Sequence, residues 1–440
     1  MIKRLLCLAL GAGVVLGLLI LRVNTMTQEM SAGDLRINAH RLEQHILGLA
    51  EFGKNEKGGL DRVAYSDADI RSRKYLMSLM KDAGLSVRVD EAGNIIGHRE
   101  GQNPELPPIM FGSHSDTVPN GGKYDGALGV LGAIECAHIL QENAIATRHP
   151  LEVIVFTDEE GGLVGSRAMT GTLTLDALDV VSHSGKTVRE GIRALEGDPE
   201  NLSKVIRQKG NIKAFLEIHI EQGRILETKG IDIGVVEGIV GISWWDVTIE
   251  GFANHAGTTP MDMRQDAMLA AAHLVVAVNR VVTGVPGRQV GTVGRIHAEP
   301  GAPNVIPGRV VMSLELRDLS SEKIQSLFEK IQEEARQISR ETDTRISFTG
   351  IDAMALPAPT DPAIRRHIAA SAEELGLSTL FMPSGAGHDA QDMARIAPTG
   401  MIFIPSVGGI SHSPKEFSRT EDMVNGVNVL LHSILRIDRD

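Results

Sequence analysis

Residues 107–143, "PPIMFGSHSDTVPNGGKYDGALGVLGAIECAHILQEN", combine an apolar run, a polar glycine-rich loop and a longer apolar run. The first run predicts a strand that leads into His114, and the second, 126–143, is long enough to predict a helix. A strand followed by a helix is the repeating unit of an α/β layer. His114, Asp116 and Asp125 lie where the predicted strand ends, which is where open α/β sheets bind ligands. The stretch therefore predicts an α/β fold with a candidate site at one edge of its sheet.

Three more apolar segments have the composition of buried strands, and each ends near side chains of the same kinds. They are 151–157, which precedes Asp158, Glu159 and Glu160; 214–220, which contains His219; and 401–406, which precedes Gly408, Gly409 and His412. Helical spacing over 37–53 and 66–85 predicts two helices, and residues 86–100 alternate in polarity and predict a hairpin. Strands that alternate with helices predict a mainly parallel sheet, so the acidic and imidazole groups should share one edge of it.

The segment from 243 to 355 has a different pattern, with strands and helices in the order βαββαβ. This order is typical of a small sheet covered by two helices. Its predicted strands are 244–251, 289–298, 308–319 and 345–351, and its predicted helices are 261–282 and 321–339. Because the candidate site residues lie on both sides of it, the segment is interpreted as an inserted α+β domain. The chain is thus divided into a leader and linker (1–36), a main domain in two parts (37–242 and 356–440) and the insertion (243–355).

The composition excludes several classes of function. A length of 440 residues predicts two or three domains, and 42% hydrophobic with 23% charged residues is typical of a globular protein. A net charge of -12 and an aromatic content of 3% argue against nucleic acid as a partner. The two cysteines, Cys7 and Cys136, exclude a disulfide framework, and Cys136 is expected to be buried and inert.

The N-terminus predicts export or anchoring. Lys3 and Arg4 precede an uninterrupted apolar run, residues 5–21, which fits a secretory h-region or a short signal anchor. Lys3 and Arg4 would stay inside, so the rest of the chain would lie on the periplasmic side. The alternative is that translation starts at Met26 or Met30 and the protein is cytoplasmic.

Five side chains are candidate metal ligands, and their mixture of imidazole and carboxylate suits zinc, or manganese as the alternative. They are His114, Asp125, Glu160, His219 and His412. Asp125 could bridge two ions, and Asp116 could accept the other imidazole N–H of His114. Glu159 and Glu160 would point in opposite directions in an extended chain, so one could bind metal while the other acts as general base.

Each of these residues also has a simpler interpretation. His412 could be a surface loop residue, Glu159 and Glu160 could belong to a solvated turn, and His219 could be an ordinary strand residue. His388 and Asp389 could cap a helix. What favours the metal site is that all five candidate ligands are expected at the ends of strands.

Eight motifs in order carry a resemblance to a known family. They are "GSHSDTVPNGGKYDGALGV" (112–130), "TDEEG" (157–161), "EIHIEQG" (217–223), "GFANHAGTTPMDMRQDA" (251–267), "GAPNVIPG" (301–308), "LELRD" (314–318), "GAGHDAQDM" (385–393) and "SHSPKE" (411–416). The sequence resembles the dinuclear-metal amidohydrolases that include N-carbamoyl-L-amino-acid hydrolase, β-ureidopropionase and allantoate amidohydrolase, relatives of carboxypeptidase G and aminoacylase. The resemblance runs from about Ile37 to the end; most relatives begin there, without a leader.

The resemblance implies roles for the candidate ligands. His114 and His219 would hold one ion, Glu160 and His412 the other, and Asp125 would bridge them. Glu159 would be the general base. Peptidase relatives carry an acidic ligand at the position of His219, so its histidine favours the carbamoyl and ureido amidases.

The resemblance also implies substrate contacts and an assembly. His255 and Asn304 would hold the carbonyl oxygen as charge develops on it, and Gln222 would touch the ureido group. Arg317 would clamp the substrate carboxylate, although a surface salt bridge between Arg317 and Asp318 is the alternative. The insertion would serve as a lid and as the surface of a homodimer.

The expected function is hydrolysis of a linear ureido or amide C–N bond in a small carboxylate substrate, with two divalent metal ions. N-Carbamoyl-L-amino acids and allantoate are the substrate types that the resemblance implies. An aminoacylase or peptidase of the same clan is one alternative, and a catalytically inactive binding homologue is the other.

Overall fold

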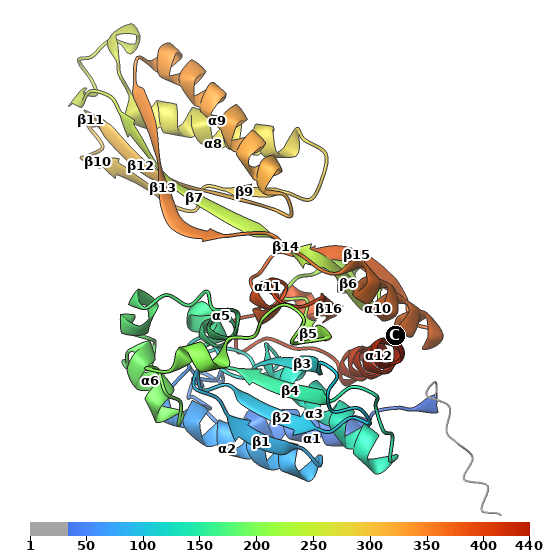
Figure 1. Ribbon diagram of the computed structural model, residues 1–440. Helices are drawn as coiled ribbons and strands as arrows, with labels where there is room; N and C mark the ends of the chain where they lie inside the picture. Colours follow the sequence, from blue (N-terminus) through green and yellow to red (C-terminus); the bar gives the residue numbers. More distant parts are fainter. Residues whose placement is uncertain (1–33) are drawn as a thin grey trace, which may run out of the picture.

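The computed structural model describes residues 34–440, with the side chains of 352–354 excepted. The predicted leader and both alternative start sites therefore lie outside the described residues. Figure 1 shows a larger body, and beside it a smaller one built from the middle of the chain. Within residues 34–440, no helix has the length and the apolar character needed to cross a membrane.

The larger body is built on a nine-stranded sheet in the order β1-β2-β4-β3-β5-β16-β6-β14, with β15 paired to β6. The four central strands are parallel, while β1, β2, β6 and β14 add antiparallel pairs at the edges. The predicted α/β class with a mainly parallel core is confirmed. The strands are β1 (Ser86–Val89), β2 (Ile95–Arg99), β3 (Ile109–His114), β4 (Leu151–Phe156), β5 (Ala214–Ile220), β6 (Ile233–Ile239), β14 (Ala358–Pro359), β15 (Thr379–Ser384) and β16 (Thr399–Ile404).

Helices pack against this sheet, and in the sequence most of them lie between its strands. They are α1 (Ala39–Leu49), α2 (Asp67–Asp82), α3 (Ala127–Glu142), α4 (Glu159–Gly162), α5 (Val164–Thr170), α6 (Val188–Ala194), α7 (Ile225–Lys229), α10 (Pro362–Glu374), α11 (Asp389–Met393) and α12 (Thr420–Arg439). The predicted helices and hairpin near the start of the chain are present. Ser66 caps α2 by accepting the N–H of Asp69, and Gly84 follows its end with φ +80°.

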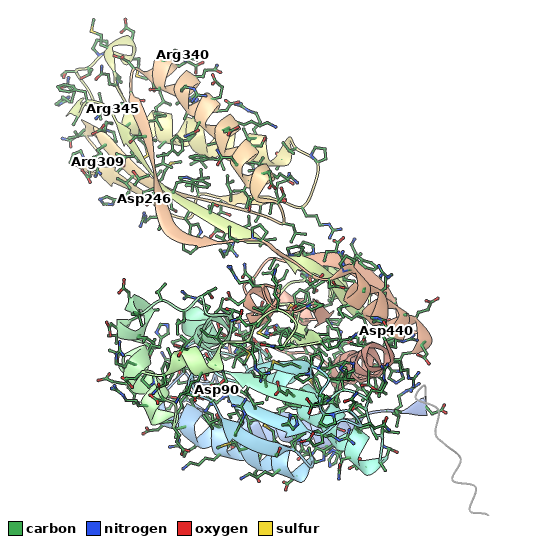
Figure 2. The ribbon with its side chains drawn as sticks, viewed as in Figure 1. Asp90, Asp246, Arg309, Arg340, Arg345 and Asp440 are labelled. Carbon is green, nitrogen blue, oxygen red and sulfur yellow. The ribbon has the colours of Figure 1, made fainter. Side chains whose placement is uncertain are left out.

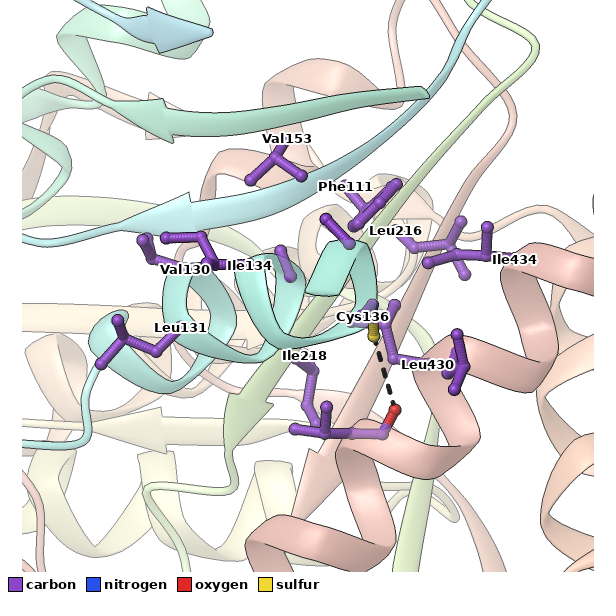
Figure 3. Packing of buried hydrophobic residues seen from close by; sticks show 14 of the residues in the cluster. Phe111, Val130, Leu131, Ile134, Cys136, Val153, Leu216, Ile218, Leu430 and Ile434 are labelled. Atoms are coloured by element: carbon purple, nitrogen blue, oxygen red, sulfur yellow. Dashed lines mark hydrogen bonds between the residues drawn. The ribbon is translucent and has the colours of Figure 1, made fainter. Parts of the chain in front are cut away.

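The core is centred on α3, which is apolar on nearly every side and is enclosed by β3, α1 and α12. Figure 3 shows Val130 and Ile134 of α3 beside Phe111 and Leu216 of the sheet and Leu430 of α12. Truncating a fully buried isoleucine such as Ile134 to alanine costs about 2–5 kcal/mol. This rigid packing fixes the position of the loop that immediately precedes α3.

Cys136 also lies in this core. It is fully buried, and its Sγ lies 3.7 Å from the carbonyl oxygen of Val427 (Figure 3). The expectation of a buried cysteine is confirmed.

The smaller body, here called the lid, contains a sheet in the order β10-β12-β7-β13, with β9 paired to β12, and helices α8 and α9. Its elements are β7 (Gly241–Glu250), β8 (Asn254–His255), α8 (Ala267–Thr283), β9 (Val290–Thr292), β10 (Ile296–Glu299), β11 (Val305–Ile306), β12 (Arg309–Asp318), α9 (Ser321–Thr342) and β13 (Arg345–Ala355). Strands β8 and β11 form a separate two-stranded sheet. The domain boundaries proposed at 243 and 355 stay predictions; β7 begins at Gly241 and β13 ends at Ala355.

Cross-strand ion pairs join opposite residues of the lid sheet. Arg309 of β12 pairs with Glu299 of β10 at 2.8 Å, and Arg345 of β13 pairs with Glu250 of β7 at 2.7 Å. Figure 2 labels both arginines on the lid. In each pair the two residues stand directly opposite one another, the arrangement in which opposite charges stabilise a sheet.

Two lid elements differ from their predicted bounds. The helix expected from Met261 begins at Ala267, because the Asp266 side chain caps the N–H groups of Met268 and Leu269. The strand expected over 289–298 is divided into β9 and β10. The break includes Gly294, and glycine weakens a strand because it adds no side chain to the packing.

Candidate metal centre and substrate pocket

A cavity of about 820 Å³ opens where β3, β4 and β5 end, and all five candidate ligands line it. Ile242 and Trp244 of the lid form part of its wall, together with Ala355 and Leu356 where the chain leaves the lid. The cavity therefore lies at the carboxyl ends of the parallel strands, as the sequence predicts, and the root of the lid borders it.

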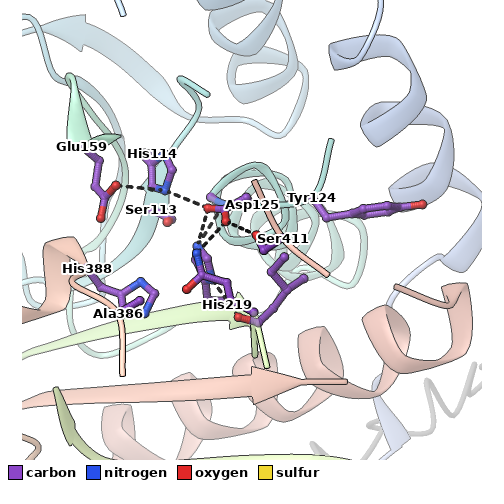
Figure 4. A network of polar contacts seen from close by, with 12 residues as sticks. Ser113, His114, Tyr124, Asp125, Glu159, His219, Ala386, His388 and Ser411 are labelled. Carbon is purple, nitrogen blue, oxygen red and sulfur yellow. Dashed lines mark hydrogen bonds and ion pairs between the residues drawn. The ribbon is translucent and has the colours of Figure 1, made fainter. Parts of the chain in front are cut away.

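His114, Asp125 and His219 form the first ligand group, with one ligand atom from each within 4.8 Å of the others. His114 ends β3, His219 lies on β5, and Asp125 ends the loop before α3. Oδ1 of Asp125 lies 3.1 Å from Nε2 of His219 and 3.5 Å from Nε2 of His114 (Figure 4). All three side chains are buried, so little of this polar group is exposed to bulk water.

The hydrogen bonds of the two imidazoles place the proton of each ring on Nδ1, so each Nε2 carries a lone pair. Nδ1 of His219 faces the carbonyl oxygen of Ile220 at 2.9 Å, and Nδ1 of His114 faces that of Asp116 at 3.1 Å. A carbonyl oxygen can only accept, so each Nδ1 carries the proton. Nε2 of His219 accordingly accepts the N–H of Gly126 at 3.0 Å. Two imidazole lone pairs beside a carboxylate oxygen fit a cation and repel one another without one.

Asp125, Glu160 and His412 form the second ligand group, again with ligand atoms within 4.8 Å. Oδ2 of Asp125 lies 3.5 Å from Nε2 of His412, which lies 3.6 Å from Oε1 of Glu160. Oε1 of Glu160 is buried and has no hydrogen-bond partner among residues 34–440 as described, which fits an atom that binds a cation. Asp125 thus turns one oxygen to each group, which is the geometry of a bridging ligand.

Glu159 and Glu160 do not lie in extended chain, in contrast to the expectation. Asp158 takes a left-handed conformation (φ 52°, ψ 56°), and the two glutamates begin the short helix α4. Successive helical residues diverge by about 100°. Oε2 of Glu159 lies 3.6 Å from Nε2 of His114, while Glu160 faces His412, so the two carboxylates still reach different groups.

The environment of these two carboxyl groups raises their pKa values. Burial raises the pKa of Glu159 well above its ordinary value; His114 opposes this effect, and Asp389 and Glu160 add to it. Burial and the charge of Asp125 raise the pKa of Glu160 to about 8. Without a metal ion, both carboxyl groups therefore favour the protonated form.

Asp116 supports the site in a different way from the one expected. Its carboxylate lies 3.6 Å from Nδ1 of His114, whereas its backbone carbonyl oxygen is the closer partner. The carboxylate instead accepts the N–H groups of Glu159 at 3.4 Å and Glu160 at 3.2 Å. Asp116 therefore fixes the ring of His114 through its backbone and the start of α4 through its side chain.

Gln222 and His388 both line the cavity. Nε2 of Gln222 donates to Oδ2 of Asp125 at 2.7 Å. His388 stands at the N-cap position of α11, but its side chain makes no capping bond, so the helix-cap interpretation does not hold. Its Nε2 instead faces Oγ of Ser384 at 2.9 Å, and its ring lies edge-on to that of His219.

His255 and Asn304 lie away from the cavity. His255 is in β8 and Asn304 is next to β11, at the end of the lid farthest from the main body (Figure 1). Both side chains are exposed, and the carbonyl oxygen of Asn304 accepts the N–H of Ala256. The structure therefore brings these two residues near each other but not to the candidate ligands of the same chain.

Arg317 lies beside the cavity rather than in its lining. Its guanidinium binds both carboxylate oxygens of Glu315, at 2.8 and 3.1 Å, and the carbonyl oxygen of Gly385 at 2.6 Å. The alternative pairing with Asp318 is not formed, because neighbouring strand residues face opposite sides while residues two apart share a face. Asp318 pairs with Lys323 at 3.2 Å instead.

Three residues that surround the ligands were not predicted from the sequence: Glu217 and Glu416, which are buried, and Ser411, which is partly exposed. Glu217 of β5 accepts the hydroxyl of Ser113 at 2.6 Å and the N–H of Ala390 at 3.0 Å. Glu416 and Ser411 contact the Asp125 loop. The available signal was the motif "SHSPKE", which contains both of the latter, but no spacing rule links it to residue 125.

Over most of its length, the chain is similar to one family of known hydrolases. The profile of the peptidase family M20/M25/M40 matches residues 110–436. The N-carbamoyl-L-amino acid amidohydrolase of Geobacillus stearothermophilus is 41% identical over 406 residues, covering 91% of this chain and 99% of that protein. The ureidoglycolate hydrolase of Arabidopsis thaliana is 40% identical over 421 residues, covering 93% and 88%. Among solved structures, an amidase of the hydantoinase/carbamoylase family from Burkholderia multivorans has a TM-score of 0.87 at 34% identity, covering 92% of this chain and 99% of that one.

Proposed function

The chain belongs to peptidase family M20/M25/M40, and from this premise we propose that it hydrolyses a linear ureido or amide C–N bond in a small carboxylate substrate. The substrate would be of the N-carbamoyl-L-amino acid or allantoate type, as the names of the similar enzymes suggest. The observation that carries the proposal is the pair of ligand groups that share Asp125 at the strand ends, with Glu159 beside them.

Two divalent metal ions are proposed, with zinc favoured and manganese as the alternative. His114 and His219 would hold one ion, and Glu160 and His412 the other, with Asp125 between them. When bound, such ions polarise a carbonyl and make water more acidic. The imidazole and carboxylate donors suit either metal, so the choice requires a measurement.

Glu159 is proposed as the general base. It accepts a proton from the attacking water as the new C–O bond forms at the carbonyl carbon, and it returns that proton to the nitrogen as the C–N bond breaks. With a carbamoyl substrate the products are an amino acid, ammonia and carbon dioxide. Gln222 is proposed to contact the ureido group; the support is that it lines the cavity and that its amide lies against Asp125.

The remaining substrate contacts require a second conformation or a second chain. Arg317 can clamp a substrate carboxylate in bidentate fashion only after exchanging a present partner, Glu315 or Gly385. His255 and Asn304, the proposed donors to the carbonyl oxygen, can reach a substrate by movement of the lid or from the lid of a partner subunit.

We propose a homodimer formed through the lid. Support comes from the groove between α8 and α9, a cavity of about 430 Å³ lined in part by Leu269, Val276 and Ile338. Val276 is 64% exposed and Leu269 46% exposed, so an apolar face of the lid has no partner within the described chain. Equilibrium sedimentation of the purified protein tests this proposal, and a monomer at micromolar concentration would contradict it.

The location of the protein is proposed as exported or anchored on the periplasmic side, through residues 5–21. The support is the charge and apolar pattern of the leader. Fractionation of cells that express the full chain, compared with a chain begun at Met26 or Met30, separates this location from the cytoplasmic one.

A substrate panel tests the activity itself. The purified chain, loaded with zinc or with manganese, is incubated with N-carbamoyl amino acids, allantoate, ureidoglycolate, a dipeptide and an N-acetyl amino acid. Ammonia release from at least one ureido acid, and little cleavage of the dipeptide or the acetyl compound, is expected. Preferential cleavage of the last two would favour the aminoacylase or peptidase alternative. No turnover with any substrate would favour the inactive homologue.

A further inference from the structure

The loop that ends in Asp125 and the loop that carries His412 are joined by one buried acid, Glu416. Glu416 is 3% exposed, and its Oε1 accepts the N–H groups of Tyr124 at 2.8 Å and Asp125 at 3.1 Å. Its Oε2 lies 2.8 Å from Oγ of Ser411. That Oγ lies 2.8 Å from Oδ2 of Asp125 (Figure 4). Asp125 is therefore held at its backbone by Glu416, and its carboxylate can accept the single hydroxyl proton of Ser411, which also contacts Glu416.

The Asp125 loop and the loop that carries His412 are closely packed against each other at Glu416. A Cβ at Gly122 would lie 2.1 Å from Oε1 and 2.2 Å from Cδ of Glu416, far below any real contact distance. Gly122 does not have a positive φ, so its backbone conformation does not require glycine. Glycine is needed there because the backbone approaches Glu416 closely. The main chain of the Asp125 loop thus passes directly over the carboxylate.

The contact with Ser411 concerns one oxygen of the proposed bridging ligand. Oδ2 of Asp125 is the oxygen that faces His412, whereas Oδ1 faces His114 and His219. Loss of the Ser411 contact should therefore disturb the second ligand group more than the first.

We propose that Glu416 and Ser411 are positioning residues that set the orientation of Asp125 and thereby the affinity of the Asp125–Glu160–His412 group for its divalent ion. The inference rests on the metal dependence in the proposed function. Neither residue is a ligand in this assignment. Both act on Asp125, one through the backbone N–H and one through the carboxylate.

Metal titration of the metal-free protein tests the inference without substrate. Zinc alone, and manganese alone, are added in competition with a chromophoric chelator, and the two binding steps are resolved. Ser411→Ala and Glu416→Ala are expected to weaken one step by roughly tenfold to a hundredfold, as is usual when a partner behind a metal ligand is removed, and to leave the other nearly unchanged. His412→Ala identifies which step belongs to the second group.

Two further variants separate positioning from charge and from folding. Glu416→Gln keeps an oxygen for the two N–H groups and can donate to Ser411, so it should stay within a few-fold of wild type. Gly122→Ala leaves every polar group intact but displaces Glu416, so it should weaken the same step as Ser411→Ala. Gly350→Ala, where a Cβ would meet no described atom within 4 Å, is the control. Thermal unfolding of each metal-free variant shows whether the fold survives.

Several outcomes would overturn the inference. They are equal weakening of both steps, unchanged metal binding in Ser411→Ala and Glu416→Ala, a Glu416→Gln variant as weak as Glu416→Ala, and a wild type that binds no metal. A wild type that binds two ions but hydrolyses no ureido acid would contradict the proposed function alone. A wild type that hydrolyses them, with variants that keep both ions, would contradict the inference alone.

Discussion

Replacing Gly126 with alanine places a methyl group against a proposed ligand. Gly126 follows Asp125 with φ +60°, and a Cβ there would lie 2.4 Å from Nε2 and Cε1 of His114. The backbone N–H of Gly126 also donates to Nε2 of His219. Gly126→Ala should therefore displace the ring of His114 and disturb the first ligand group directly.

The expected loss in the free energy of unfolding has two parts, and a control variant separates them. A positive φ costs an alanine roughly 1–2 kcal/mol, and Gly126 has φ 60° with ψ -44°. Overpacking in a closed site typically adds about 1–3 kcal/mol. Gly185→Ala is the matched control, since Gly185 has φ +82° but a Cβ there would meet nothing within 4 Å. The free energy of unfolding of the metal-free protein should thus fall by about 2–5 kcal/mol in Gly126→Ala and by only the first part in Gly185→Ala.

Urea unfolding of the metal-free variants, with metal analysis of the same preparations, measures both effects. Gly126→Ala should lose stability beyond the control and should retain less metal, while Gly185→Ala should keep the metal content of wild type. Equal stability of the two variants, together with normal metal content in Gly126→Ala, would refute the described packing of Gly126 against His114.

Three other predictions concern the proton, the metal and the second chain. Glu159→Gln should abolish turnover while the metal stays bound, so near-normal activity in a metal-replete sample contradicts its role as base. In the metal-free protein Glu160, with a pKa of about 8, is protonated at neutral pH and must lose that proton to bind an ion. Metal affinity, measured by chelator competition, should therefore rise from pH 6 to 8, and an affinity independent of pH speaks against this. If the lid of one subunit completes the site of the other, a mixed dimer of Glu159→Gln and His255→Ala chains contains one intact site. Co-expression of the two chains should then restore ammonia release, which neither homodimer shows. An inactive mixture argues for lid movement within one chain.

The sheet and the position of the site at its edge were predictable, because strands and helices are encoded by patterns of neighbouring residues in the sequence. His114, Glu160 and His219 follow or end buried apolar runs, and parallel strands bring their carboxyl ends to one edge. Asp125 and His412 lie on loops, and only the chemistry of the set and the resemblance singled them out. Their convergence in the structure depends on packing around α3, which the apolar pattern also predicts.

Other features depend on contacts that no local pattern encodes. The left-handed turn at Asp158 places Glu159 and Glu160 on a helix, although an isolated reading of "TDEEG" favours extended chain. Glu416 bonds to a backbone N–H 291 positions away. The pairing of Arg317 with Glu315 follows from the period of a strand, but its bond to Gly385 depends on how the lid sits on the main body.

Metal analysis of wild type, Asp125→Ala and His412→Ala, after dialysis against metal-free buffer, tests most directly whether one carboxylate serves two ions. Wild type should retain two equivalents of zinc or manganese per chain, His412→Ala about one, and Asp125→Ala fewer than His412→Ala, because both groups lose a donor. An Asp125→Ala protein that still retained two equivalents, or a wild type that retained none and was not activated by either metal, would contradict the account.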